Sequence, residues 1–151
     1  MSIQSAKAPP PSSAARSGVA PVGVLALLFG LSGCGGALSG RFQGTCELGE
    51  GSGRFSMPID HDLVEDGEGK ITGFGSFRFN DFTFTGEALG ERSGEHVLVD
   101  VIGEAGGYTL TVRVIGEADE ELTKIDGQCG FVDQGAPYSG AVNMKRAEDE
   151  G

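Results

Sequence analysis

The stretch FRFNDFTF, residues 77–84, alternates aromatic and polar side chains on both sides of a central Asn-Asp pair. Alternation with a period of two predicts β-strands, and Asn and Asp favour a tight turn between them. Folding the stretch about Asn80-Asp81 places Phe79 opposite Phe82 and Phe77 opposite Phe84, and it brings Gly75 opposite Gly86. Because cross-strand aromatic pairs stabilise a sheet, we expect a hairpin with four phenylalanines on one face.

A repeat predicts a second hairpin. The string V-x-V-I-G-E-A occurs at residues 99–105 and again at residues 112–118, with Gly106-Gly107 between the two copies. Glycines between alternating segments mark a turn, so we expect two paired strands that share the same ending. Two copies are too few for a solenoid.

Further alternating segments bring the expected strands to about eight. They cover residues 40–48, 52–59, 70–76 continued by 77–79, 122–129 and 136–145. Turn signals separate them, and no segment has a sustained helical period. This pattern predicts an all-β domain over residues 41–146. The expected form is a small antiparallel up-and-down meander closed into a barrel, with a β-sandwich as the alternative.

The first 33 residues have the order of a secretory signal. Lys7 and Arg16 are the only charges among residues 1–17, and the thirteen residues 19–31 carry no charge. A membrane-spanning helix needs about 20 apolar residues, whereas the apolar region of a signal peptide has about 7–15. We therefore expect residues 1–33 to be a signal peptide that is removed.

The end of this segment, Leu31-Ser32-Gly33-Cys34, resembles the lipobox of bacterial lipoproteins. The resemblance implies cleavage before Cys34, attachment of lipid to its thiol and acylation of the new amino group. The alternative is an ordinary signal peptide with a coincidental cysteine near the cleavage site. Residue 35 is Gly and not the Asp that retains lipoproteins in the inner membrane of some bacteria. The resemblance thus implies an outer-membrane location, facing the periplasm or the surface. The seven steps from Cys34 to Arg41 span at most about 25 Å, so we expect residues 34–40 to be a short tether.

Two further cysteines remain, Cys46 and Cys129. The cell envelope is an oxidising compartment, so an even pair there predicts a disulfide. Free or metal-binding thiols are the alternative, but the pair lacks the CxxC spacing of a zinc site.

The charge of the chain restricts its partners. All 22 acidic residues but only nine of the 11 Lys and Arg residues lie in residues 34–151, which therefore carry a net formal charge of −13. A chain this acidic does not hold a phosphate backbone by counterion release, so we expect no nucleic-acid partner. We interpret the charge as a determinant of solubility, and residues 147–151 as an acidic frayed tail.

The sequence offers little catalytic chemistry. As a calcium loop starting at Asp60, the acidic run has Val64 and Glu65 where Asp or Asn and then Gly are required. We therefore interpret the run around Asp60-His61-Asp62 as a solvated acidic loop. The other histidine, His96, begins an alternating strand and is expected at the surface. We predict no catalytic residues, no metal, no cofactor and no enzyme activity.

Two functions fit these observations. The first is an envelope structural or interaction module, held to the membrane by its lipid and working on a protein partner through its outer surface. The second is a small hydrophobic ligand bound inside the barrel, suggested by five closely spaced aromatic residues: Phe74, Phe77, Phe79, Phe82 and Phe84. The segment Gly40-Arg41-Phe42-Gln43-Gly44 is also faintly similar to the G-x-W-x-G start of calycin barrels such as lipocalins, with Phe in place of Trp.

Overall fold

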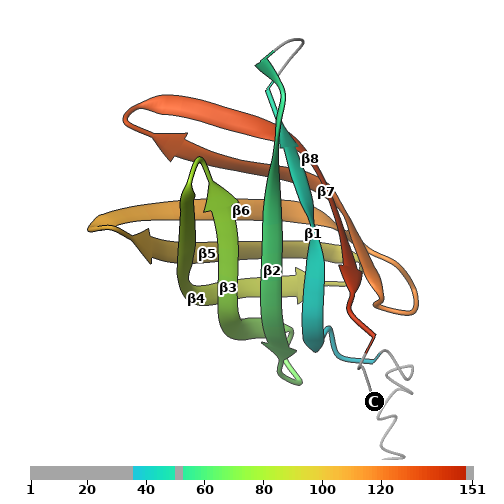
Figure 1. Ribbon diagram of the computed structural model, residues 1–151. Helices are drawn as coiled ribbons and strands as arrows, with labels where there is room; N and C mark the ends of the chain where they lie inside the picture. The colour runs from blue at the N-terminus through green and yellow to red at the C-terminus, as the bar shows by residue number, and fades with distance from the viewer. Residues whose placement is uncertain (1–35, 50–52, 149–151) are drawn as a thin grey trace, which may run out of the picture. The chain divides into compact units, whose positions relative to one another are not determined.

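The computed structural model describes residues 36–49 and 53–148 of the chain. These residues form eight strands (Figure 1). The strands are β1 (Gly40–Leu48), β2 (Phe55–Glu65), β3 (Lys70–Phe79), β4 (Phe82–Ser93), β5 (His96–Ala105), β6 (Tyr108–Ala118), β7 (Lys124–Asp133) and β8 (Ala136–Arg146).

The strands form a closed antiparallel barrel in which each strand pairs with the next one along the chain. Pairing of β1 with β8, from Phe42 opposite Arg146 to Leu48 opposite Gly140, closes the circle. The predicted eight-stranded up-and-down barrel is confirmed, and the sandwich alternative is wrong. Closure gives β1 and β8 a partner on both sides, so neither remains a free edge.

Alternation along each strand builds the core. Side chains that point inward are apolar and buried, whereas those that point outward are mostly polar. The largest fully buried apolar side chains are Phe42, Phe77, Leu38, Leu48, Met57, Leu63, Ile71, Ile125, Met144, Val97 and Val99. Side chains therefore fill the interior of the barrel.

The hairpin of residues 77–84 has the predicted register. Phe79 lies opposite Phe82, and Phe77 lies opposite Phe84. The rings of Phe77 and Phe84 stack with centroids 5.2 Å apart and planes within 5°. Phe77, Phe79 and Phe84 are buried, but Phe82 lies near the turn and is 51% exposed. Phe74 points outward and is 59% exposed, so the expectation that it lines the interior is wrong.

The repeated string also forms the predicted hairpin. Val99 pairs with Val114 and Val101 pairs with Val112, and all four side chains are buried. The two strands end at the equivalent alanines, Ala105 in β5 and Ala118 in β6.

The acidic run after Ile59 is not a loop. Strand β2 covers residues 55–65 instead of the expected 52–59, so Asp60, His61 and Asp62 lie within it. Asp60 and Asp62 alternate with His61, which points inward and is fully buried. Inward and outward side chains alternate with a period of two through this run. The alternation was hard to recognise in the sequence, because acidic residues occupy the outward positions while the inward positions continue the core.

The barrel has two distinct ends. At the N-terminal end lie the connections of residues 66–69, 94–95 and 119–123. At the opposite end, the hairpin end, two-residue turns join β3 to β4, β5 to β6 and β7 to β8. Gly106 and Gly107 both have positive φ angles, 57° and 83°, which the tight β5–β6 turn requires.

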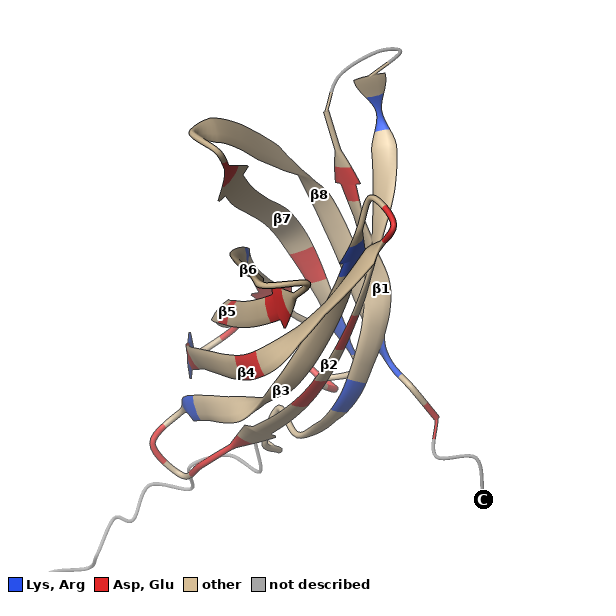
Figure 2. Ribbon diagram, turned by 60° about the vertical axis from the view of Figure 1, so that its left-hand side comes forward, with Lys and Arg blue, Asp and Glu red and all other residues tan. Residues whose placement is uncertain are grey.

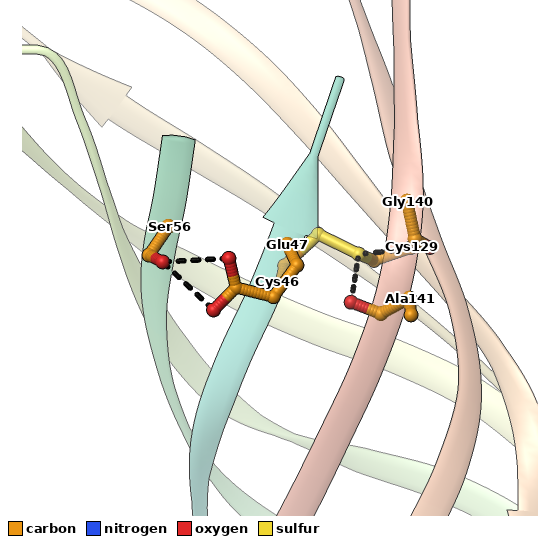
Figure 3. Close-up of a disulfide and its surroundings, with 6 residues drawn as sticks. All are labelled: Cys46, Glu47, Ser56, Cys129, Gly140 and Ala141. Atoms are coloured by element: carbon orange, nitrogen blue, oxygen red, sulfur yellow. Dashed lines mark hydrogen bonds between the residues drawn. A yellow bond between two sulfur atoms is a disulfide. The ribbon is translucent and has the colours of Figure 1, made fainter. Parts of the chain in front are cut away.

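A disulfide joins Cys46 in β1 to Cys129 in β7, as predicted (Figure 3). These strands are the two neighbours of β8, and the two Cα atoms lie 6.0 Å apart. Two strands separated by a third lie about 9.6 Å apart in a flat sheet. The sheet therefore bends sharply at β8, and the disulfide crosses the inside of the bend, where the Cys129 sulfur contacts the carbonyl oxygen of Gly140 at 3.4 Å.

Candidate functional site

Cys34, the predicted lipid attachment residue, lies outside the described residues, as does the signal segment of residues 1–33. The description begins two residues later, at Gly36, and the chain from there to Gly40 contacts the N-terminal end of the barrel. The lipid site therefore stays a prediction, and the residues that follow it can be placed.

Leu38 fixes this segment to the barrel. Its side chain is fully buried and belongs to the hydrophobic core. Its main-chain N–H donates a hydrogen bond of 2.6 Å to Oε2 of Glu65, the last residue of β2. The main-chain N–H of Glu65 in turn donates to the hydroxyl of Ser39 at 3.1 Å. Residues 36–39, which fall within the expected tether of residues 34–40, therefore contact the barrel.

A charge pair supports this contact. Arg92, near the end of β4, donates from Nε to both carboxylate oxygens of Glu65 at 3.0 and 2.9 Å. The side chain of Glu65 is only 4% exposed and that of Arg92 is 17% exposed. Arg92 also donates from Nη2 to the carbonyl oxygen of Gly36 at 3.2 Å and from Nη1 to that of Gly94 at 2.8 Å. One buried carboxylate thereby connects β2, β4 and the N-terminal segment.

The two histidines have different environments. His61 sits inside the barrel, and neither ring nitrogen has a hydrogen-bond partner among the described residues. Burial lowers the pKa of His61 to about 4, although the nearby Asp60 carboxylate opposes the shift. His96 is exposed at the surface, as predicted, 3.7 Å from Glu117.

Acidic residues occur along most of the strands and in several turns (Figure 2). Asp60 accepts hydrogen bonds from Arg41 and Gln43 of β1. The hydrogen bond from Arg41 keeps the pKa of Asp60 below its usual value, against the effect of partial burial. Asp119 accepts a main-chain N–H bond from Lys124 and main-chain and hydroxyl bonds from Thr123, which lower its pKa and order the turn before β7. Within residues 36–49 and 53–148, no group of three acidic, His or Cys side chains could hold a metal ion.

The hairpin end carries a feature that sequence reasoning missed. Strands β6 and β7 pair only from Arg113 opposite Gly130 to Ala118 opposite Ile125, and toward the hairpin end they separate (Figure 1). A pocket of about 270 Å³ lies beside this gap. Its lining residues are Phe79, Asn80, Phe82, Phe84, Tyr108, Thr109, Leu110, Asp133 and Gln134. No local pattern signals the separation, because both strands alternate normally through it.

These features define a small disulfide-linked β-barrel domain, with its N-terminal segment bound at one end and an aromatic pocket at the other. The chain matches no known protein family, no curated protein and no solved structure. In the part of the chain that the structure describes, no helix is long and apolar enough to cross a membrane.

Proposed function

We propose that this chain is a lipid-anchored lipoprotein of the bacterial cell envelope, located at the outer membrane, and that its barrel is a non-catalytic interaction module. The lipobox-like Leu31-Ser32-Gly33-Cys34 supports the anchor. The observation that carries the proposal is the burial of Leu38 beneath the Glu65–Arg92 pair. It places Leu38, four positions after the predicted lipid attachment residue, at one defined end of the barrel.

The stretch of chain between Cys34 and Leu38 is short. Leu38 follows Cys34 by four positions, which is at most about 14 Å of extended chain. A lipid on Cys34 would therefore keep the N-terminal end of the barrel beside the bilayer. The hairpin end, with its aromatic pocket, would face away from the membrane and toward partners.

The placement of the histidines supports a role without catalysis. A general base must reach its substrate, yet His61 is enclosed in the barrel and has a depressed pKa of about 4. His96 is accessible but lies beside Glu117 on the outer surface, and neither residue lines the aromatic pocket.

The packing of the interior gives little support to the alternative of a small hydrophobic ligand inside the barrel. Phe77 stacks on Phe84, and Phe79 packs edge-on against Phe131 with centroids 4.8 Å apart. These rings therefore serve as core side chains and contact one another.

Metabolic labelling tests the anchor. The complete chain is expressed in a bacterium fed a fatty acid with an alkyne tag, and the mature protein is analysed by intact mass and by membrane fractionation. We expect the wild-type chain to lose residues 1–33, to carry the tag and to sediment with the outer membrane. Cys34→Ala should carry no tag, whereas the matched control Cys46→Ala/Cys129→Ala should keep it. A wild-type chain without fatty acid would refute the anchor.

A further inference from the structure

The incomplete β6–β7 ladder leaves main-chain groups without a strand partner among residues 36–49 and 53–148. Strand β6 pairs with β5 over ten residues, from Tyr108 to Glu117, but with β7 only over six, from Arg113 to Ala118. Strand β7 pairs with β8 along its whole length. Residues 108–112 of β6 and 131–133 of β7 therefore border a gap, which we call the slot.

The direction of the main-chain groups in β6 follows from one hydrogen bond. The N–H of Ala118 donates to the carbonyl oxygen of Glu95, on the β5 side, at 2.8 Å. In an antiparallel strand the N–H and C=O of one residue point to the same side, and those of the next residue point to the other side. The main-chain groups of the even-numbered residues of β6 therefore face β5. The main-chain groups of Thr109 and Thr111 therefore face the slot.

The turns give the same result on both sides of the slot. Ala105 and Tyr108 flank a two-residue turn and so form a hydrogen-bonded pair, which again leaves Thr109 directed toward β7. In β7, Asp133 and Ala136 flank the Gln134-Gly135 turn, so Val132 directs its main-chain groups away from β8 and into the slot. The slot thus has donors and acceptors on both edges.

The pocket beside the slot supplies an apolar surface. Phe79, Phe84 and Leu110 are nearly buried and form its floor, and Phe82 and Tyr108, 51% and 65% exposed, stand at its rim. Its volume of about 270 Å³ is below the range of about 300–1,000 Å³ that small-molecule sites occupy. It suits one large side chain of a longer partner.

The charges around the slot favour a basic partner. Asp133 is the one charged residue among the described lining residues of the pocket. Asp81 lies in the β3–β4 turn next to the lining residue Asn80, and Glu104 is paired with Thr109 across the β5–β6 hairpin. These three carboxylates complement cationic side chains on either side of an apolar one.

We propose that the slot receives an extended segment of a partner protein, which adds a strand to the Thr109–Thr111 edge of β6. An apolar side chain of the segment occupies the pocket, and basic side chains beside it meet Asp81, Glu104 and Asp133. Strand addition of this kind takes its affinity from main-chain hydrogen bonds and its specificity from pockets for alternate side chains. The site is independent of lipid attachment, so each proposal can fail without the other.

Peptide binding to the complete, oxidised, ¹⁵N-labelled chain tests the site. The probe is the peptide acetyl-Lys-Thr-Val-Phe-Val-Thr-Lys-amide, with versions that carry Leu or Trp at the centre. At saturation we expect the amide hydrogens of Thr109 and Thr111 to exchange at least about tenfold more slowly. The same peptide with N-methyl groups on alternate residues cannot form the ladder and should bind at least about tenfold more weakly. Glu in place of Lys should also weaken binding.

Two variants at one position add a matched control. Thr111→Pro removes an N–H that faces the slot beyond the end of the β6–β7 ladder, and Pro is tolerated on strand edges. It should abolish peptide binding, whereas Thr111→Val keeps the N–H and should bind within about twofold of the wild type. Equal binding of the methylated peptide, or resonance shifts at Phe82 and Tyr108 without amide protection, would overturn strand addition. No binding of any of the three peptides at millimolar concentration would also overturn it.

Discussion

The carboxylate of Glu65 accepts the main-chain N–H of Leu38 at 2.6 Å, across 27 residues of sequence. The same carboxylate is paired with Arg92. A carboxylate that is 4% exposed is costly unless it is paired and hydrogen-bonded, and here both conditions are met. The contact determines where the chain enters the barrel, and it makes Glu65 the most informative position for mutation.

We predict that Glu65→Ala destabilises the domain by about 3 kcal/mol, because it leaves Arg92 and the Leu38 N–H without their partner. Glu65→Gln keeps an oxygen for Leu38 and should cost less. Urea unfolding measures both. The control is Asp100→Ala, which breaks the exposed pair with Arg113 and should cost at most about 1 kcal/mol. Equal losses for Glu65→Ala and Asp100→Ala would contradict a supporting role for the buried pair.

His61 should make the stability of the barrel depend on pH. Its pKa is about 4 in the folded chain and about 6.5 when unfolded, so the unfolded state binds more protons between these values. Neutral His61 therefore leaves the free energy of unfolding at its full value above about pH 6.5, and this free energy falls as the pH decreases toward 4. Between about pH 7.5 and about pH 5 the loss should be about 2 kcal/mol.

The variant His61→Leu tests this source of pH dependence by denaturant unfolding at both pH values. It should lack the loss of about 2 kcal/mol, because no buried base remains to be protonated. His96→Ala, at an exposed position, should keep the loss in full. If His61→Leu and the wild type lose equal stability on acidification, buried His61 is not the cause.

Gly75 leaves room for the ring of His61. A Cβ atom at this position would lie 2.7 Å from Val101 Cγ2 and 2.9 Å from His61 Cδ2. We expect Gly75→Ala to destabilise the barrel by about 1–3 kcal/mol through overpacking, and Val101→Ala to restore part of the loss in the double variant. At Gly67 a Cβ would meet no atom within 4 Å, so Gly67→Ala is the matched control. Equal melting temperatures for Gly75→Ala and Gly67→Ala in thermal unfolding would disprove the steric argument.

The disulfide should provide a large share of the stability. Cys46 and Cys129 are 83 residues apart, and the chain-entropy model gives about 4–5 kcal/mol for a loop of this length. Cys46→Ala/Cys129→Ala, or reduction of the wild type, should lower the denaturant midpoint accordingly. Cys34→Ala leaves the bond intact and should not change the midpoint. An unchanged midpoint in the double variant would show that the barrel is closed equally well without the bond.

The sequence predicted those parts of the fold in which local pattern and final environment agree. The alternation in FRFNDFTF determined its own register because the Asn80-Asp81 turn leaves few ways to pair the phenylalanines. The disulfide was predictable from an even pair of cysteines, given the oxidising compartment that the signal-like segment predicts.

Other features of the fold could not be predicted, because they depend on contacts between residues far apart in the sequence. The end of β2 resembled a solvated loop because the residue that neutralises Glu65, Arg92, lies 27 positions away. The burial of Leu38 has the same long-range origin. The slot between β6 and β7 could not be predicted from the sequence. It depends on where the two strands stop pairing, and the alternation of side chains along each strand carries no information on that point.

The order of the strands also governs how the chain is assembled. Seven of the eight pairings join consecutive strands, so hairpins can form as the chain emerges, with little entropy of loop closure. The eighth pairing is different: β1 begins at Gly40, and its second partner, β8, is not complete until Arg146. Until then the nascent sheet keeps an open edge on β1, which is a site for intermolecular pairing. The chain is therefore most prone to aggregate in the interval after β1 has formed and before β8 pairs with it.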